Sequence, residues 1–271
     1  MDDIERTHMD VQGLRCLVTG TASGIGDAVA RQLVAAGATV VSLDRNTPTA
    51  PVEQHVKVDL ADPASIDAAL EQIDGNFDAL LNVAGIPGTA PADLVFKVNF
   101  LGMRHLTESL FERLNEGGSI VVVSSTAGFG WPQRLDVLKE VVATESFAEG
   151  EKWFAEHPQQ GNAYNFSKEA ATVYTLAMGG AVREMNELRI NAVLPGPVET
   201  PILADFEESM GKETLDGVKA FLGRHATAAD IASAVVFLAS RDSRWINGTT
   251  LIADGGITGA VLAGLVPAPT I

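Results

Sequence analysis

The stretch TGTASGIG, residues Thr19–Gly26, decides the fold class because it joins a strand-like run directly to a helical pattern. The run before it, Leu14–Val18, is mostly apolar, as a strand covered on both faces is. The pattern after it, Ile25–Ala36, has apolar residues at helical spacing and is followed by Gly37, a typical helix C-cap. Glycines in such a turn let the backbone approach a pyrophosphate, and the helix N-terminus offers free N–H groups to the phosphates. A plain strand-to-helix turn is the alternative.

Further strand-like runs alternate with helical patterns along the chain. One helix is expected to begin at Asp62 and Pro63, since Asp is favoured at the N-cap and Pro in the first turn. This alternation predicts right-handed crossovers and a Rossmann-like α/β fold, with a doubly wound parallel sheet of about seven strands. Because no linker or repeat divides the chain, we expect one domain over residues 1–271. The later runs are Thr39–Leu43, His55–Val58, Ala79–Val83, Ser119–Val123, Arg189–Val193 and Thr249–Ile252.

Composition excludes several classes of function. Lys and Arg number 19 against 35 Asp and Glu, so the formal net charge of −16 argues against nucleic acid and anionic membranes as partners. The single cysteine, Cys16, can form neither an internal disulfide nor a structural zinc site, which fits a reducing compartment. The acidic first ten residues are unlike a signal peptide, and the longest apolar run, Ile257–Ile271, is too short to span a bilayer. We expect a cytoplasmic protein without a metal centre.

Asp44 stands at the end of the second run, where an acidic residue can accept hydrogen bonds from an adenosine ribose. A carboxylate there would repel a 2′-phosphate, which favours NAD over NADP. The neighbouring Arg45 could instead pair with that phosphate, so NADP stays open. Asp44 could also be an ordinary turn residue, since Asp44–Pro48 has the composition of a turn.

Tyr164 and Lys168 lie four residues apart in the helical stretch Ala163–Met185 and therefore share one helix face. A tyrosine with its ordinary pKa of about 10 is a poor acid or base at neutral pH. A nearby ammonium favours the phenolate and is expected to lower that pKa. The same spacing is also common on exposed helix surfaces, so the pair indicates a catalytic site only together with other motifs in the sequence.

Six motifs, in this order, resemble the short-chain dehydrogenase/reductase family. The resemblance covers about residues 12–256 and implies a nicotinamide-dependent oxidoreductase on a Rossmann-like fold. The motifs are TGTASGIG (Thr19–Gly26), NVAG (Asn82–Gly85), VNFLG (Val98–Gly102), Ser124-Ser125, YNFSK (Tyr164–Lys168) and PGPVET (Pro195–Thr200).

The resemblance implies four catalytic residues. Tyr164 would be the acid/base that exchanges a proton with the substrate oxygen, and Lys168 would lower its pKa and bind the nicotinamide ribose. Ser125 would hydrogen-bond the substrate oxygen, and Asn99 would hold a water in a proton relay to Lys168. Structural roles remain as alternatives: a strand-end cap for Ser125, and a buried amide at a helix kink for Asn99.

The resemblance also implies a set of NAD-binding residues. Asp59 and Leu60 would contact the adenine, and Val198 and Thr200 would hold the nicotinamide carboxamide. The alternative for the PGPVET segment is a rigid turn without a ligand. The complete set is Gly20, Ser23, Gly24, Ile25, Gly26, Asp44, Asp59, Leu60, Asn82, Ala84, Gly85, Tyr164, Lys168, Pro195, Gly196, Val198 and Thr200.

The segment Thr126–Gly161 is longer than in most members of the family and has the pattern of two short amphipathic helices. Its aromatic residues could form a satellite core, or Phe129, Trp131 and Trp153 could line a pocket for a flat apolar substrate. A second unusual segment, 199–224, is expected to be a mobile lid over the substrate.

Three longer stretches resemble the branch of the family that contains bacterial 3α-hydroxysteroid dehydrogenase/carbonyl reductases and coniferyl-alcohol dehydrogenases. They are GIPGTA (Gly85–Ala90), WPQRLDVLKE (Trp131–Glu140) and SRWINGTTLIADGG (Ser243–Gly256). The branch implies an apolar aromatic, terpenoid or steroid-like alcohol, oxidised reversibly with NAD, and a homo-oligomer. Family members are usually tetramers, and the inserted helices could obstruct one interface and leave a dimer. The alternatives are an NADP-preferring carbonyl reductase, an isomerase or dehydratase, and a catalytically silent NAD-binding regulatory protein.

Overall fold

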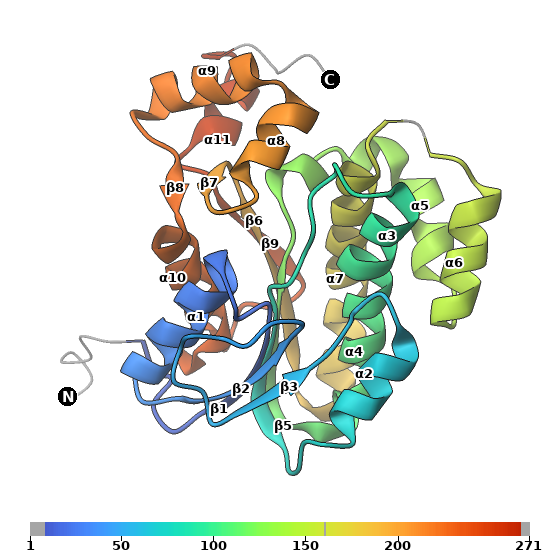
Figure 1. Ribbon diagram of the computed structural model, residues 1–271, viewed down its shortest axis with the longest axis vertical. Helices are drawn as coiled ribbons and strands as arrows, with labels where there is room; N and C mark the ends of the chain where they lie inside the picture. Colours follow the sequence, from blue (N-terminus) through green and yellow to red (C-terminus); the bar gives the residue numbers. More distant parts are fainter. Residues whose placement is uncertain (1–8, 160, 267–271) are drawn as a thin grey trace.

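The computed structural model describes residues 9–159 and 161–266, and its centre is a seven-stranded sheet of order β3-β2-β1-β4-β5-β6-β9 (Figure 1). Every neighbouring pair in this sheet runs parallel. The order turns back on itself at β1, as in a doubly wound sheet, and this confirms the predicted Rossmann-like fold. The strands are β1 (Arg15–Thr19), β2 (Thr39–Asp44), β3 (Gln54–Lys57), β4 (Phe77–Asn82), β5 (Leu114–Val123), β6 (Arg189–Pro195) and β9 (Thr249–Ala253).

Helices cover both faces of the sheet (Figure 1). On one face α1 (Gly24–Ala35) packs against α10 (Ala228–Ala239), and their apolar sides join the inward residues of the strands in one buried cluster. On the other face lies a second buried cluster, built around α7 (Ala163–Asn186). The remaining helices on that face are α2 (Pro63–Leu70), α3 (Ala92–Phe96) and α4 (Met103–Ser109), with a π-helical stretch over Lys97–Gly102 between the last two.

The inserted segment forms α5 (Leu135–Val142) and α6 (Phe147–Glu156), which confirms the two predicted helices. Both helices lie outside α3 and α7 (Figure 1). Arg104 of α4 is 1% exposed and ties this insertion to the body of the fold. Its guanidinium donates hydrogen bonds of 2.8 Å to the Thr144 carbonyl, the Thr144 hydroxyl and the Ser146 carbonyl. Burial lowers the pKa of this guanidinium. The chain between α5 and α6 is thus held by a buried charge.

The aromatic side chains of α6 complete the core instead of facing a ligand. Phe154 stacks on Phe96 with 4.3 Å between ring centroids, and Trp153 lies parallel to Phe166 at 6.1 Å. Both α6 residues pack against the buried cluster around α7. The satellite-core interpretation is therefore confirmed for this helix.

The segment after β6 rises above the sheet as α8 (Leu203–Met210) and α9 (Lys212–Leu222), near the short last helix α11 (Ile257–Leu262) (Figure 1). It is carried by a narrow base in which β7 (Val198–Glu199) pairs in parallel with β8 (Ala226–Thr227). No helix in the described part of the chain is both long and apolar enough to cross a membrane.

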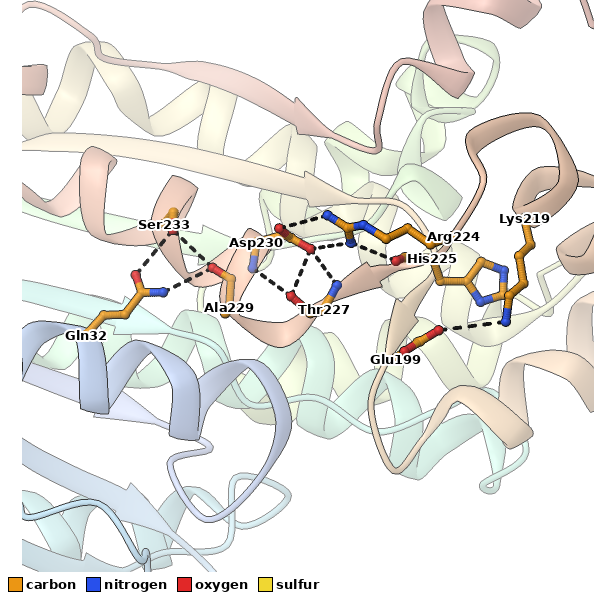
Figure 2. A network of polar contacts seen from close by, with 9 residues as sticks. All are labelled: Gln32, Glu199, Lys219, Arg224, His225, Thr227, Ala229, Asp230 and Ser233. Atoms are coloured by element: carbon orange, nitrogen blue, oxygen red, sulfur yellow. Dashed lines mark hydrogen bonds and ion pairs between the residues drawn. The ribbon is translucent and has the colours of Figure 1, made fainter.

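Charged and polar contacts secure that base (Figure 2). Glu199 forms an ion pair of 3.8 Å with Lys219 of α9. Arg224 contacts Asp230 at 2.6 Å, and Asp230 also forms a capping box with Thr227 at the start of α10. Gln32 of α1 donates to the carbonyl of Ala229, so α10 is fixed to α1 directly below the base. These contacts make the base a defined support for α8 and α9.

Candidate active site

Two adjoining cavities lie at the carboxyl edge of the sheet, where open α/β sheets bind ligands. The larger, of about 390 Å³, is bounded by the glycine turn, the ends of β2, β3 and β4, and the start of the segment 199–224. The smaller, of about 100 Å³, is bounded by the end of β5, the start of α7, the PGPVET segment and α9. Ile25, Gly85 and Thr200 line both cavities, so the two share a wall.

The glycine turn brings backbone N–H groups to the larger cavity. Gly20 has φ of 76°, and a Cβ on it would lie 2.8 Å from the Cα of Ala84. A Cβ on Gly26 would collide with the carbonyl of Gly20. The side chain of Ser23, the N-cap of α1, makes no capping hydrogen bond, so the first N–H groups of this helix remain available to the cavity. This arrangement fits a dinucleotide pyrophosphate.

Asp44 is fixed at the far end of the same cavity. Its Oδ2 accepts the N–H of Ala22 at 2.9 Å, and its Oδ1 accepts the N–H of Asn46 at 2.8 Å. Arg45 lines the cavity beside it, and the residues predicted to contact adenine, Asp59 and Leu60, lie on the same wall. The structure therefore brings together all the residues predicted for the adenosine end.

Asn82 and Thr19 shape the end of β4 from behind the cavities. Asn82 is 4% exposed, and its Nδ2 donates to the hydroxyl of Thr107 at 2.9 Å. It lines neither cavity, unlike its neighbours Ala84 and Gly85. The Thr19 hydroxyl, which the sequence interpretation missed, accepts the N–H groups of Val83 and Ala84 at 2.9 and 3.0 Å. These bonds hold the NVAG segment against β1.

Ser125, Tyr164 and Lys168 meet in the smaller cavity. The Tyr164 hydroxyl is hydrogen-bonded to the side chain of Ser125, and the Lys168 Nζ lies 5.6 Å from the centre of the Tyr164 ring. Lys168 donates to the carbonyl of Val123 at 2.9 Å. Ser125 also accepts the N–H of Ala127 at 3.1 Å, so it caps a short 3-10 turn as well.

Burial dominates the protonation of this pair. It raises the pKa of Tyr164 to about 12, against the opposing effect of the Ser125 hydrogen bond. It lowers the pKa of Lys168 to about 8. The expectation that Lys168 lowers the pKa of Tyr164 is wrong for this arrangement, because desolvation of the phenolate outweighs its stabilisation. The ammonium instead points to the carbonyl of Val123.

Asn99 lies in the π-helical stretch and is 3% exposed. Its Oδ1 accepts the N–H of Ile86 at 2.8 Å, and its Nδ2 donates to the Ile86 carbonyl at 3.0 Å and to Ser167 Oγ at 3.2 Å. A Cβ on Gly85 would lie 3.3 Å from Asn99 Oδ1 and 3.4 Å from Lys168 Nζ, so Gly85 sits between the two side chains. The carboxamide of Asn99 thus links the loop after β4 to α7, the helix that carries Tyr164.

The wall of the smaller cavity is mostly apolar. The PGPVET segment and the residues after it contribute Pro195, Pro197, Val198, Ile202 and Leu215. No aromatic residue of Thr126–Gly161 lines either of the described cavities. The pocket interpretation of Phe129, Trp131 and Trp153 is therefore wrong for these cavities.

Two contacts at the site escaped the sequence interpretation. Asn162 accepts the N–H of Tyr164 at 2.7 Å, and an Asn directly before a helical pattern is an N-cap signal that could have revealed it. Thr89 donates to Asp205 Oδ1 at 2.8 Å, between the loop after β4 and α8. No local sequence pattern marks a bond between residues so far apart in the chain.

Comparison with known proteins agrees with this geometry. A family model described as short chain dehydrogenase matches residues 15–135, and one described as Enoyl-(Acyl carrier protein) reductase matches residues 140–258. Coniferyl-alcohol dehydrogenase of Pseudomonas sp. strain HR199 is 39% identical to this chain, over 92% of this chain and 98% of that protein. The chain belongs to the short-chain dehydrogenase/reductase family.

Two further relatives of this family are similar over nearly the whole length. The 3-alpha-hydroxysteroid dehydrogenase/carbonyl reductase of Comamonas testosteroni is 30% identical over 89% of this chain and 95% of that protein. The 3-alpha-hydroxysteroid dehydrogenase from Pseudomonas sp. B-0831, solved as a complex with NADH, superposes with a TM-score of 0.78 at 30% identity, over 93% of this chain and 99% of that chain. The chain is thus an oxidoreductase of a family that uses a nicotinamide cofactor.

Proposed function

We propose that this protein is an NAD-dependent alcohol dehydrogenase that interconverts a secondary or benzylic/allylic alcohol and its carbonyl compound. The observation that carries the proposal is the hydrogen-bonded pair of Ser125 and Tyr164, with Lys168 beside it, in the smaller cavity that adjoins the one suited to a dinucleotide. The similarity to coniferyl-alcohol dehydrogenase supports the same reaction class.

The chain's own groups supply proton transfer and orientation. When bound along the glycine turn and the end of β2, NAD would supply the hydride acceptor for alcohol oxidation. Ser125 donates a hydrogen bond to the substrate oxygen, and the Tyr164 phenolate accepts the hydroxyl proton. The Ser125 hydrogen bond is the contact that opposes the burial-raised pKa of Tyr164, and Asn99 holds the loop that lies beside Lys168 and supports the proton relay. In reduction the same proton returns from Tyr164 to the oxygen.

The preference for NAD rests on Asp44. Two backbone N–H groups fix its carboxylate at the cavity rim, where it can accept hydrogen bonds from the ribose hydroxyls. A 2′-phosphate at this place would meet that negative charge. Arg45 lies on the same wall and could offset part of this repulsion. Measuring activity with NAD and with NADP therefore tests the NADP-preferring alternative.

The substrate is proposed to be uncharged and largely apolar. Among the described residues that line the smaller cavity, Lys168 is the one charged side chain, and the other polar groups are hydroxyls. Lys168 donates to the carbonyl of Val123, and the rest of the wall offers no charge to pair with a carboxylate or phosphate on the substrate. Aromatic, terpenoid and steroid-like alcohols fit this description.

The deciding experiment measures NADH absorbance with a panel of such alcohols, including coniferyl alcohol, with NAD and NADP in parallel. Tyr164→Phe removes the acid/base and should lower kcat by about a thousandfold or more while NAD still binds. Near-normal turnover in this variant would refute the mechanism. A product that forms without net cofactor change would identify an isomerase or dehydratase, and NAD binding without any turnover would identify the regulatory alternative.

A further inference from the structure

We propose that Asn162 is a positioning residue for Tyr164, because it joins the first turn of α7 to the loop Gly85–Ala90 and so fixes where the tyrosine hydroxyl lies. This inference rests on the proposed role of Tyr164 as the acid/base. Asn162 itself is assigned no contact with substrate or cofactor.

Asn162 is the N-cap residue of α7. Asn162 is extended, with φ of −82° and ψ of 130°, and its Oδ1 accepts the backbone N–H of Tyr164 at 2.7 Å. Asn is among the residues most favoured at this position, because its side-chain oxygen satisfies an N–H that has no partner inside the helix. The bond also fixes the peptide group from which the Tyr164 side chain departs.

The carboxamide of Asn162 also contacts the loop that bears Gly88. A Cβ placed on Gly88 would lie 2.6 Å from Asn162 Oδ1 and 2.8 Å from its Nδ2. The Gly88 backbone therefore packs directly against the carboxamide, at a distance that no other residue type allows without displacement. This contact limits the rotation of the cap toward the loop.

The loop that bears Gly88 is itself fixed to the site. Both backbone polar groups of Ile86 are bonded by Asn99, and Gly85 lies between Asn99 and the Lys168 ammonium. Asn162 thus connects a loop fixed beside Lys168 to the residue that begins the Tyr164 turn. An error of about 1 Å in the placement of a reacting group can cost up to about a hundredfold in rate.

The first test compares Asn162→Ala with Asn162→Ser, using NAD and coniferyl alcohol as the probe. The alanine variant should lower kcat about tenfold or more, with the KM for NAD changed less than about twofold. The serine variant should recover most of kcat, because Ser also caps helices well. Wild-type kcat in the alanine variant, or no recovery in the serine variant, overturns the proposal.

Gly88→Ala supplies an independent test. Its added methyl group meets the Asn162 carboxamide, so it should lower kcat in the wild-type background. In the Asn162→Ala background the collision partner is gone, and the same change should have little further effect. Additive effects of the two substitutions would show that Gly88 acts without Asn162 and would overturn the proposal.

A third readout needs no turnover. The backbone N–H of Tyr164 should exchange with solvent deuterium faster in Asn162→Ala than in the wild type or in Asn162→Ser, as followed by NMR. Unchanged exchange overturns the positioning role. Because Tyr164→Phe is assayed alongside, a fully active phenylalanine variant would instead reveal failure of the proposed function.

Discussion

The hydroxyl of Thr89 donates a 2.8 Å hydrogen bond to Oδ1 of Asp205, and this bond joins the loop after β4 to α8. Asp205 also lines the larger cavity, so the bond lies beside the proposed NAD site. The segment 199–224 thus has contacts at two places: the Glu199–Lys219 ion pair at its base, and this hydrogen bond at α8.

Thr89→Val keeps the shape of the side chain but removes the donor. Since an exposed hydrogen bond of this kind contributes about 0.5–1.4 kcal/mol, NADH should dissociate about two- to tenfold faster from the variant. Stopped-flow fluorescence of NADH release measures this rate. Thr89→Ser keeps the hydroxyl and should release NADH at the wild-type rate. Equal rates in all three proteins would exclude a role for the bond in cofactor release.

Removing Arg134 should destabilise the protein in a pH-dependent way. Burial raises the pKa of Glu169, and the Arg134 guanidinium, 2.5 Å from Oε2, opposes that rise. Without Arg134 the folded-state pKa of Glu169 rises further, so the variant loses stability as pH increases through that value. Arg134→Ala should cost about 1–3 kcal/mol of unfolding free energy at pH 8 and less at pH 5, measured by urea denaturation.

The matched control for that prediction is Arg134→Ala combined with Glu169→Gln. The neutral amide carries no charge to leave unpaired, so the double variant should lose most of the pH dependence. A pH-dependent loss that persists in the double variant would assign the effect to other groups.

Lys168 should make stability rise with pH above neutrality. Burial lowers its pKa to about 8, against about 10.4 in the unfolded chain. Between these values the unfolded chain binds more protons, so the free energy of unfolding increases with pH, by about 1.5 kcal/mol from pH 8 to pH 9.5. Lys168→Met should lack this contribution.

The comparison between wild type and Lys168→Met is needed because Cys16 acts in the opposite direction. Burial raises the pKa of this thiol to about 12, so its contribution to stability falls as the unfolded chain loses the thiol proton. Cys16 is the same in both proteins, and the difference between the two pH profiles isolates Lys168. Parallel profiles would contradict the buried ammonium.

The insertion bears on the predicted oligomer. Helices α5 and α6 lie outside α3 and α7, so they cover part of the surface through which a second copy could approach the Tyr-bearing helix (Figure 1). We therefore predict a homodimer built from the last helix and strand. Multi-angle light scattering should give twice the chain mass of 28.5 kDa. A tetramer with contacts at α7 would contradict this prediction.

Local sequence patterns predicted the glycine turn, the first strands and the long helix α7 to within two residues at their ends. These elements are set by short-range periodicity and capping, which a sequence displays directly. β5 begins at Leu114 instead of Ser119, because Leu114 pairs with Phe77 before the register shifts. Asn115, Glu116 and Gly117 interrupt the apolar pattern, so the sequence predicted a later start for this strand.

Other features depended on what surrounds a residue. The sequence placed Tyr164 and Lys168 on one helix face, but burial on all sides decides their pKa values. It also left two interpretations for the aromatic residues of the insertion, since only the fold brings Phe96 and Phe166 under α6. Asn82 was predicted to bind NAD and Asn99 to act in the proton relay, although neither lines the two described cavities.

Arg104 has a consequence for engineering and divergence of this scaffold. Its guanidinium is bonded to backbone carbonyls and the hydroxyl of the chain between α5 and α6, inside the protein. Trimming the insertion would remove these hydrogen-bond partners, and a guanidinium that stays enclosed without them costs several kcal/mol. We therefore expect a shortened variant to fold only when Arg104 is replaced by an apolar residue at the same time. The deletion and the substitution would have to be made, or to arise in evolution, together.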